Sequence, residues 1–253
     1  VNIIRHPGLV EIFEQGQRPD GTLYIVMEYL EGQSLRQWLS QRDASKSIPA
    51  IIALAVQLAR ALAASHEKGI IHRDLKPENI MLIADPVRPG VERAKILDFG
   101  IAKLQRRSTP GGVASRVKTQ AGAVIGTPLY MAPEQFGQAE SVDGAADVFA
   151  LGVILYELST GRMPYQESSL KLLNEPLVPI RKRNPNAPKK FAALVERMLT
   201  LGESARPRMA DVARDLASLE QHLQPAGGKP LRYALLGGGL VSLLLGGGYV
   251  VQQ

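Results

Sequence analysis

Residues 72–79 read HRDLKPEN and are the most informative stretch of the chain. Two shorter blocks follow in order, DFG at residues 98–100 and APE at residues 132–134. The stretches Ile80–Ile83 and Lys95–Leu97 enclose a loop that contains proline and glycine, and their composition predicts two strands. We therefore expect the octapeptide to lead into a strand and the DFG triplet to follow one.

The flanking sequence predicts a small sheet followed by a mostly helical body. Residues 9–13 and 23–29 are rich in Val, Ile and aromatic residues, and the turn residues at 18–21 between them predict a hairpin. Residues 98–134 show no clear period and predict a long loop. Helices are expected at Ile51–His66 and at about 145–159, 189–200 and 209–223.

The three blocks resemble the catalytic loop, the metal-binding triplet and the end of the activation segment of protein kinases. Eight contiguous matches followed by two triplets at suitable distances are too specific for coincidence. The chain resembles bacterial eukaryotic-like (Hanks-type) serine/threonine kinases over residues 1–223. The resemblance implies an α+β, protein-kinase-like fold, with a mostly helical C-lobe joined to a remnant of the N-lobe sheet.

The resemblance also implies a role for each polar residue. Asp74 would accept the proton of the substrate hydroxyl. The positively charged ammonium of Lys76 would point toward the transferred phosphate. Asn79 and Asp98 offer oxygen ligands that suit Mg²⁺ bridging phosphate oxygens, so ATP and Mg²⁺ are the implied cofactors. Lys76 is typical of the serine/threonine branch, which makes Ser/Thr hydroxyls of proteins the implied substrates. Glu78 could attract a basic substrate residue, although too many kinases carry it for it to define one.

The adenine site is expected where the hairpin ends. Residues 27–30 read MEYL and resemble the hinge between the two lobes, where the backbone of Glu28 and Leu30 would hydrogen-bond the adenine edge. Met27 would be the gatekeeper, and Met81 would lie beneath the adenine ring. Both methionines would serve equally well as core residues.

Four further residues are expected to be structural rather than catalytic. Glu134 would form the buried ion pair of the family with Arg206. Asp147 would hold the backbone of the catalytic loop from a central helix. His66 would end its helix rather than take part in chemistry.

Arg73 beside Asp74 suggests regulation, because in kinases with this pair a phosphate on the activation segment neutralises the arginine and orders the loop. Thr119 is the favoured acceptor, since it precedes Thr127 by eight residues, a spacing typical of autophosphorylated bacterial relatives. Thr127 would itself hydrogen-bond near the catalytic Asp and Lys. The alternative acceptors are Ser108, Thr109 and Ser115.

The C-terminal segment is expected to cross a membrane. Residues 224–232 have the composition of a linker, and residues 233–251 carry no charge and approach the ~20 apolar residues of a spanning helix. Lys229 and Arg232 precede this segment, so the positive-inside rule places the kinase domain in the cytoplasm, at a bacterial inner or plasma membrane. Gly238, Ser242 and Gly246 would suit a homodimer contact, although glycine is common in such helices anyway.

Composition narrows the partners. The chain has no cysteine, which excludes disulfides and Cys-based metal sites. Its 30 Lys and Arg outnumber 24 Asp and Glu, and the net charge of +6 would admit nucleic acid or anionic lipid as a partner. The longest run of basic residues is residues 181–183, and no recognition motif stands out. Nucleic-acid binding is therefore not expected.

Both ends suggest a fragment, because the chain starts at Val1 without Met and stops at Gln253 after an apolar stretch. The Gly-rich loop, strand Lys and helix Glu of a kinase N-lobe are expected just upstream. Two interpretations follow: a transmembrane serine/threonine kinase seen in part, or a non-catalytic pseudokinase scaffold at the membrane. The kinase is favoured, because a chain without catalysis has no physical need to keep its four catalytic positions together. These are Asp74, Lys76, Asn79 and Asp98.

Overall fold

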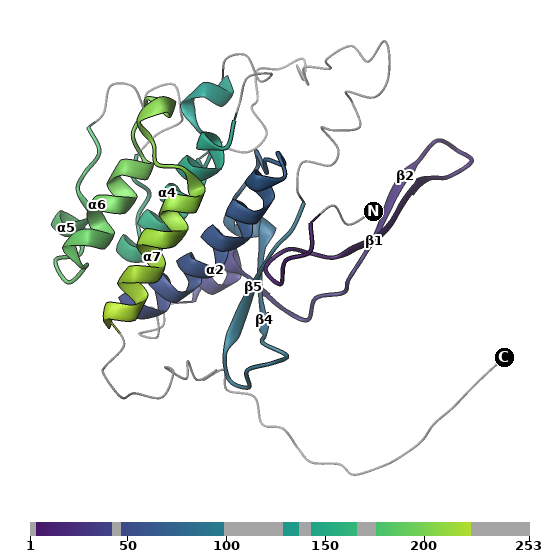
Figure 1. Ribbon diagram of the computed structural model, residues 1–253, viewed down its shortest axis with the longest axis horizontal. Coiled ribbons are helices and arrows are strands. Elements are labelled where there is room, and N and C mark those ends of the chain that lie inside the picture. Colours follow the sequence, from purple (N-terminus) through teal and green to yellow (C-terminus); the bar gives the residue numbers. More distant parts are fainter. Residues whose placement is uncertain (1–3, 42–46, 99–128, 137–142, 166–175, 224–253) are drawn as a thin grey trace.

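The computed structural model describes residues 4–41, 47–98, 129–136, 143–165 and 176–223 (Figure 1). The strands are β1 (Ile12–Gln17), β2 (Leu23–Met27), β3 (Gly32–Ser34), β4 (Ile80–Ala84) and β5 (Glu92–Ile96). The α-helices are α1 (Leu35–Ser40), α2 (Ile48–Glu67), α4 (Ala145–Thr160), α5 (Ile180–Arg183), α6 (Lys189–Met198) and α7 (Met209–Leu223). Short 3-10 turns are η1 (Pro77–Asn79), η2 (Pro133–Phe136) and η3 (Glu203–Ala205).

The strands form two antiparallel sheets. The predicted hairpin is confirmed: β1 pairs with β2, with Ile12 opposite Met27 and Gln17 opposite Leu23. The second sheet has the order β3-β4-β5, so the strand that follows the octapeptide is central. Figure 1 shows the hairpin projecting away from the helices, while β4 and β5 lie beside α2.

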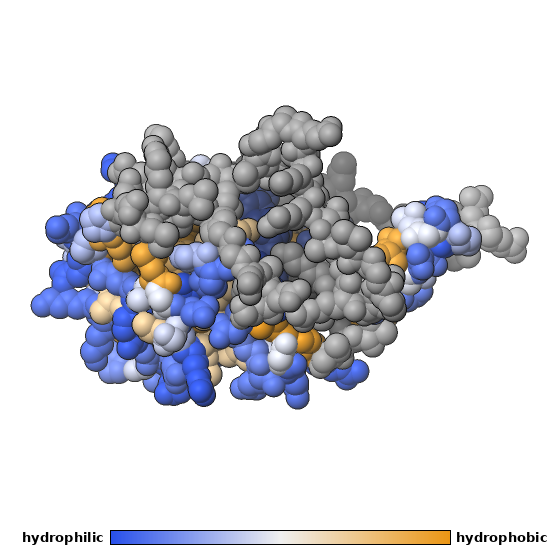
Figure 2. Space-filling model, turned by 90° about the horizontal axis from the view of Figure 1, so that it is seen from above, coloured by the Kyte–Doolittle hydropathy of each residue, from blue (hydrophilic) through white to orange (hydrophobic). Residues whose placement is uncertain are grey.

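The hairpin exposes apolar side chains that the helices do not cover. Tyr29, just after β2, is 92% exposed, and the exposed large side chains of the strands are Phe13, Leu23, Ile25, Val26 and Met27. In Figure 2 the hairpin lies at the right, where orange and blue surfaces adjoin. An isolated two-stranded hairpin is marginally stable, so this element depends on contacts at its base.

The long helix α2 is the centre of the helical body. It begins at the N-cap Ser47, whose side chain accepts a hydrogen bond from the amide of Ala50, and Pro49 lies in its first turn. Its end is followed by Gly69, whose φ of 71° is a left-handed conformation that glycine adopts without strain. Among the described residues, α2 alone is long and apolar enough to span a bilayer, and 56% of that window is buried in the protein, as in a core helix.

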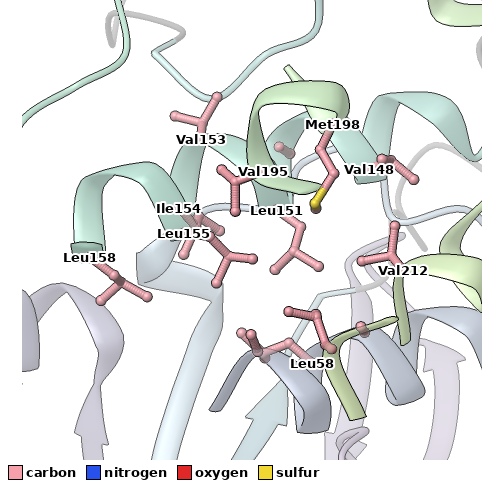
Figure 3. Packing of buried hydrophobic residues seen from close by; sticks show 14 of the residues in the cluster. Leu58, Val148, Leu151, Val153, Ile154, Leu155, Leu158, Val195, Met198 and Val212 are labelled. Carbon is pink, nitrogen blue, oxygen red and sulfur yellow. The ribbon is translucent and has the colours of Figure 1, made fainter. Parts of the chain in front are cut away.

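The core lies where α2, α4, α6 and α7 meet. Figure 3 shows Leu58 of α2, Leu151 of α4, Met198 of α6 and Val212 of α7 turned toward a common interior. Helix α4 is buried along almost its whole length. A Cβ on its Gly152 would stand 3.0 Å from the Cβ of Met198, so glycine lets α4 and α6 approach closely. This packed body fixes the position of the loop between α2 and β4.

Two short elements escape the sequence interpretation. The strand β3 and the helix α1 follow the hinge directly, and α1 is capped by Ser34, which accepts a hydrogen bond from the amide of Gln37 while the Gln37 side chain accepts from the Ser34 amide. Leu35, the first residue of α1, is fully buried. The strand expected at Lys95–Leu97 also begins three residues earlier, at Glu92.

Candidate active site

The loop between α2 and β4 is held from below by one buried carboxylate. Asp147, in the first turn of α4, accepts hydrogen bonds from the amides of His72 and Arg73, each at 2.8 Å. Its side chain is almost completely buried, so these bonds are shielded from water. The prediction that Asp147 holds the loop backbone is confirmed.

Backbone strain is concentrated at this site. Arg73 (φ 65°) and Asp98 (φ 51°) are the non-glycine residues with positive φ in the described part of the chain. Such conformations cost on the order of 1–3 kcal/mol and persist only where the surroundings impose them. At Arg73 the amide is bound by Asp147, and the carbonyl accepts from the Gln135 side chain at 2.8 Å. The loop is therefore held in one shape before any substrate binds.

The shape of the loop presents Asp74 to solvent. The carboxylate of Asp74 is 52% exposed, and its Oδ2 lies 2.9 Å from the Lys76 ammonium. The side-chain nitrogen Nδ2 of Asn79 donates to the Asp74 carbonyl at 2.8 Å and lies 3.4 Å from Oδ2 of Asp74. The structure thus brings together the three residues predicted to be catalytic, with a cation beside an accessible carboxylate.

Asn79 and Asp98 lie at the same end of the sheet. Ile80 of β4 pairs with Ile96 of β5, and the amide of Leu97 donates to the Asn79 carbonyl at 2.8 Å. Asp98 follows Leu97 and is exposed. Because the Asn79 nitrogen is bonded to the Asp74 carbonyl, its Oδ1 is the atom left to face a cation. One carboxylate and one amide oxygen fit Mg²⁺, which typically takes few protein ligands and completes its shell with phosphate and water.

The hinge is tied to the sheet by an ion pair that the sequence did not reveal. Lys95 of β5 is buried, and its ammonium lies 2.5 Å from the Glu28 carboxylate and donates to the Leu9 carbonyl at 3.1 Å. The same carboxylate accepts from the Glu11 amide at 2.8 Å. A lone Lys in a strand gives no sequence signal of this contact, because its partner is 67 positions away.

The ion pair links the hinge to the strand that pairs with Met81, another expected adenine contact. Lys95 is paired across the sheet with Met81 of β4, so the Glu28 hinge and Met81 lie against the same strand. Leu30, the last residue of the hinge, is half-buried. Met27 ends β2 and is 38% exposed, so it is not packed as a core residue.

His66 lies in the last turn of α2, as expected, and also makes a contact that the sequence did not reveal. Its Nε2 lies 2.7 Å from Oδ2 of Asp147, the oxygen that also binds the His72 amide. His66 therefore supports the residue that supports the loop. Its position six residues before the octapeptide gave no such signal, because Asp147 comes 81 positions later.

The ion pair predicted between Glu134 and Arg206 is confirmed. Two guanidinium nitrogens of Arg206 lie 2.6 and 3.0 Å from the two carboxylate oxygens of Glu134. Arg206 is buried and also donates to the carbonyls of Thr200, Leu201 and Ala145. The end of the APE block is therefore anchored to the helical body.

Several predicted residues lie outside the described part of the chain. These are Thr119, Thr127, the last two residues of the DFG block and the segments 224–232 and 233–251.

Comparison with known proteins gives a consistent result. The family model for the protein kinase domain matches residues 1–216. The chain is 40% identical to the serine/threonine-protein kinase pkn3 of Myxococcus xanthus over 81% of this chain and 36% of the relative. It is 32% identical to the serine/threonine-protein kinase PknB of Mycolicibacterium smegmatis over 90% of this chain and 36% of the relative. The chain thus spans about a third of the length of these relatives.

A solved structure shares the fold. The kinase domain of Mycobacterium tuberculosis PknI superposes with a TM-score of 0.62 at 26% identity. The match covers 85% of this chain and 73% of that domain.

Proposed function

The chain belongs to the protein kinase family, and we propose that it transfers the γ-phosphate of ATP to Ser and Thr hydroxyls of proteins. The observation that carries this proposal is the exposed Asp74 carboxylate, 2.9 Å from Lys76 and fixed through its backbone by Asn79. The similarity to serine/threonine-protein kinases supports the same acceptor class.

Asp74 would act on the attacking hydroxyl, and Lys76 would act on the phosphate that it attacks. A hydroxyl that donates a hydrogen bond to Asp74 is oriented for attack and has an acceptor for its proton. Lys76 lies beside the same carboxylate, so its ammonium would also stand near the phosphate that receives the hydroxyl oxygen. Because negative charge builds on that phosphate during transfer, a fixed cation there lowers the barrier.

Asn79 and Asp98 would hold Mg²⁺ on the phosphates. Mg²⁺ held there would supply positive charge that offsets the charge of the phosphates. Asn79 keeps its Oδ1 turned away from the Asp74 carbonyl by donating through nitrogen. The strained φ of Asp98 sets the direction in which its carboxylate leaves the sheet.

The adenine would bind at the hinge. The backbone groups of Glu28 and Leu30 would pair with the adenine edge, while the Glu28 side chain is engaged by Lys95. Met27 and Met81 would supply apolar surface to the ring.

The acceptor class is tested by phosphoamino-acid analysis of the natural full-length protein and of dephosphorylated casein after incubation with γ-labelled ATP and Mg²⁺. Labelled phosphoserine and phosphothreonine are expected. Label in phosphotyrosine alone would contradict the proposal. An Asn79→Ala variant should need at least about tenfold more Mg²⁺ for half-maximal nucleotide binding, since it removes one of few ligands.

Regulation and anchoring are proposed from the sequence. Arg73, whose backbone is fixed in the loop, would bind a phosphate on Thr119, added in trans by a neighbouring copy. Phosphopeptide mapping of active protein should find phosphate on Thr119, and finding none between Asp98 and Tyr130 would contradict this. Residues 233–251 would anchor the chain with the kinase domain in the cytoplasm, and alkaline extraction of membranes should then leave the protein in the pellet.

A further inference from the structure

One arginine joins two carboxylates beside the catalytic loop. Arg36 of α1 lies with its Nε 2.8 Å from Glu78 Oε1 and its Nη1 3.2 Å from Glu157 Oε1. Its Nη2 donates to the hydroxyl of Tyr130, which in turn donates to Glu157 Oε2 at 2.5 Å. The guanidinium carbon also lies 5.6 Å from the centre of the Tyr130 ring. We call these four residues the Arg36 cluster.

These contacts determine the protonation of Arg36 and Tyr130. Burial alone lowers the pKa of Arg36, but the hydrogen bonds to Glu78 and Tyr130 and the charge of Glu157 outweigh it and raise that pKa, so the guanidinium stays charged. Burial and the hydrogen bond to Glu157 raise the pKa of Tyr130, which therefore stays a neutral phenol. The single cation Arg36 is therefore in contact with both carboxylates.

The Arg36 cluster lies within reach of a bound substrate. Glu78 comes four positions after Asp74 in the same loop, between Lys76 and Asn79. A chain spans at most ~3.3–3.6 Å per residue, so Glu78 lies within ~14 Å of Asp74. A peptide whose hydroxyl rests on Asp74 can therefore bring a side chain within about four positions of the acceptor to Glu78. The Glu78 side chain is 48% exposed and accessible to it.

Two carboxylates at this distance from the acceptor would select a basic substrate residue if they had no internal partner. The guanidinium of Arg36 already takes the place that such a residue would fill, with three of its nitrogens engaged. A second cation would have to displace it or share the same oxygens. A basic substrate residue would therefore compete with Arg36 for Glu78.

We propose that Arg36 is a specificity-determining residue that fills an acidic subsite from within the chain and so removes selection for basic residues near the acceptor. This inference rests on the proposed function for its link to phosphorylation. The subsite itself is a matter of binding and is testable without turnover.

The test compares wild type, Arg36→Gln and a matched control, Arg197→Gln, all in the natural full-length protein. Arg197 is also an exposed helical arginine in an ion pair, at 3.1 Å from Asp215, but it joins α6 to α7 away from the loop. The probes are fluorescent peptides with one Thr and either Arg or Glu at one of the four positions on each side. A second set carries Ala in place of Thr and reports binding alone.

Wild type and Arg197→Gln should bind the Arg and Glu peptides within about twofold of each other at every position. In Arg36→Gln the uncovered carboxylates should favour the Arg peptide at least about fivefold at one position, through KM in the Thr set and through Kd in the Ala set. The preference should shrink in high salt, because exposed charges are screened. An unchanged ratio in Arg36→Gln, or a shift toward Glu, overturns the proposal.

A second variant separates charge from a folding defect. Arg36→Gln combined with Glu78→Gln removes one of the two carboxylates, and the preference for Arg should fall back toward that of wild type. A ratio in the double variant equal to that of Arg36→Gln would contradict a role for Glu78. If the Ala peptides show the Arg preference while no Thr peptide is phosphorylated by any variant, the subsite stands and the proposed phosphotransfer fails.

Discussion

The imidazole Nε2 of His66 lies 2.7 Å from Oδ2 of Asp147, and this contact joins the end of α2 to the start of α4 directly beneath the catalytic loop. The same carboxylate binds the amides of His72 and Arg73. A residue that never reaches a substrate can therefore control how firmly Asp74 is positioned.

Replacing His66 by Ala should lower kcat several-fold and leave the KM for ATP within about twofold. The loss follows because Asp147 keeps its two amide bonds but loses the side chain that orients it. Steady-state kinetics below the unfolding temperature measure the effect. The control is His222→Ala, since His222 is exposed on α7 and its Nδ1 contacts the Ser218 carbonyl of the same helix.

A Gln in place of His66 provides the decisive comparison, because its amide can still donate to Asp147. Partial recovery of kcat in His66→Gln is expected. If His66→Ala keeps wild-type kcat, the imidazole does not position the loop.

Loss of Glu134 should destabilise the domain more than loss of any surface ion pair. Glu134→Ala leaves the buried Arg206 guanidinium without its carboxylate, which costs on the order of 3 kcal/mol. Urea unfolding of the purified protein measures it. Arg214→Ala breaks an exposed pair with Asp211 and should cost about 0.5 kcal/mol or less. Equal effects would show that the Glu134 pair contributes no more to stability than a surface pair does.

Asp85, which directly follows β4, should make the free energy of unfolding depend on pH in the acid range. Burial raises its pKa, but hydrogen bonds from the amides of Val87 and Arg88 and from the guanidinium groups of Arg88 and Arg93 outweigh burial and lower it from 3.8 to about 2. A carboxylate with a lowered pKa stabilises the fold above its ordinary value and loses that contribution as pH falls toward its folded value. Asp85→Asn should therefore be less stable than wild type at pH 6, and the difference should narrow between about pH 4 and pH 2. A difference that stays constant with pH would contradict this assignment.

Lys95→Met should weaken ATP binding more than it slows chemistry. The change removes the Lys95 ammonium from the Glu28 carboxylate, which keeps its hydrogen bond from the Glu11 amide, and so breaks the link between the hinge and β5. We expect the KM for ATP to rise about fivefold or more while kcat changes less. Lys190→Met on the exposed face of α6 is the control. An unchanged KM would show that the ion pair does not hold the hinge.

The sequence predicted those parts of the fold whose signals are local. The long apolar run of α2 and the turn of the hairpin around Gly21 have strong patterns and were located correctly, whereas the first strand begins at Ile12, three residues later than expected. The helix α1 was missed, although Ser34 and Gln37 form a capping box and Leu35 and Trp38 have helical spacing. Six residues are too few for periodicity to stand out against the neighbouring polar residues.

The site was predicted where motif spacing fixes it. The family resemblance also gave two contacts between distant segments, Glu134 with Arg206 and Asp147 with the catalytic loop, whereas the other such contacts were missed. Asp74, Lys76 and Asn79 fall within six positions of one another, so one loop brings them together. The partners His66–Asp147, Lys95–Glu28 and Arg36–Glu157 are 81, 67 and 121 positions apart. Such pairs depend on how helices and strands pack, and no single-chain pattern records them.

The most direct test of the account is single-turnover phosphotransfer by the natural full-length protein and its Asp74→Asn variant, with ATP binding measured in parallel. Asp74→Asn keeps the size of the side chain and removes the carboxylate that would accept the proton. We predict that the transfer rate falls by about 100-fold or more while the Kd for ATP stays within threefold. A transfer rate close to that of wild type would contradict the assignment of Asp74 and with it the proposed mechanism.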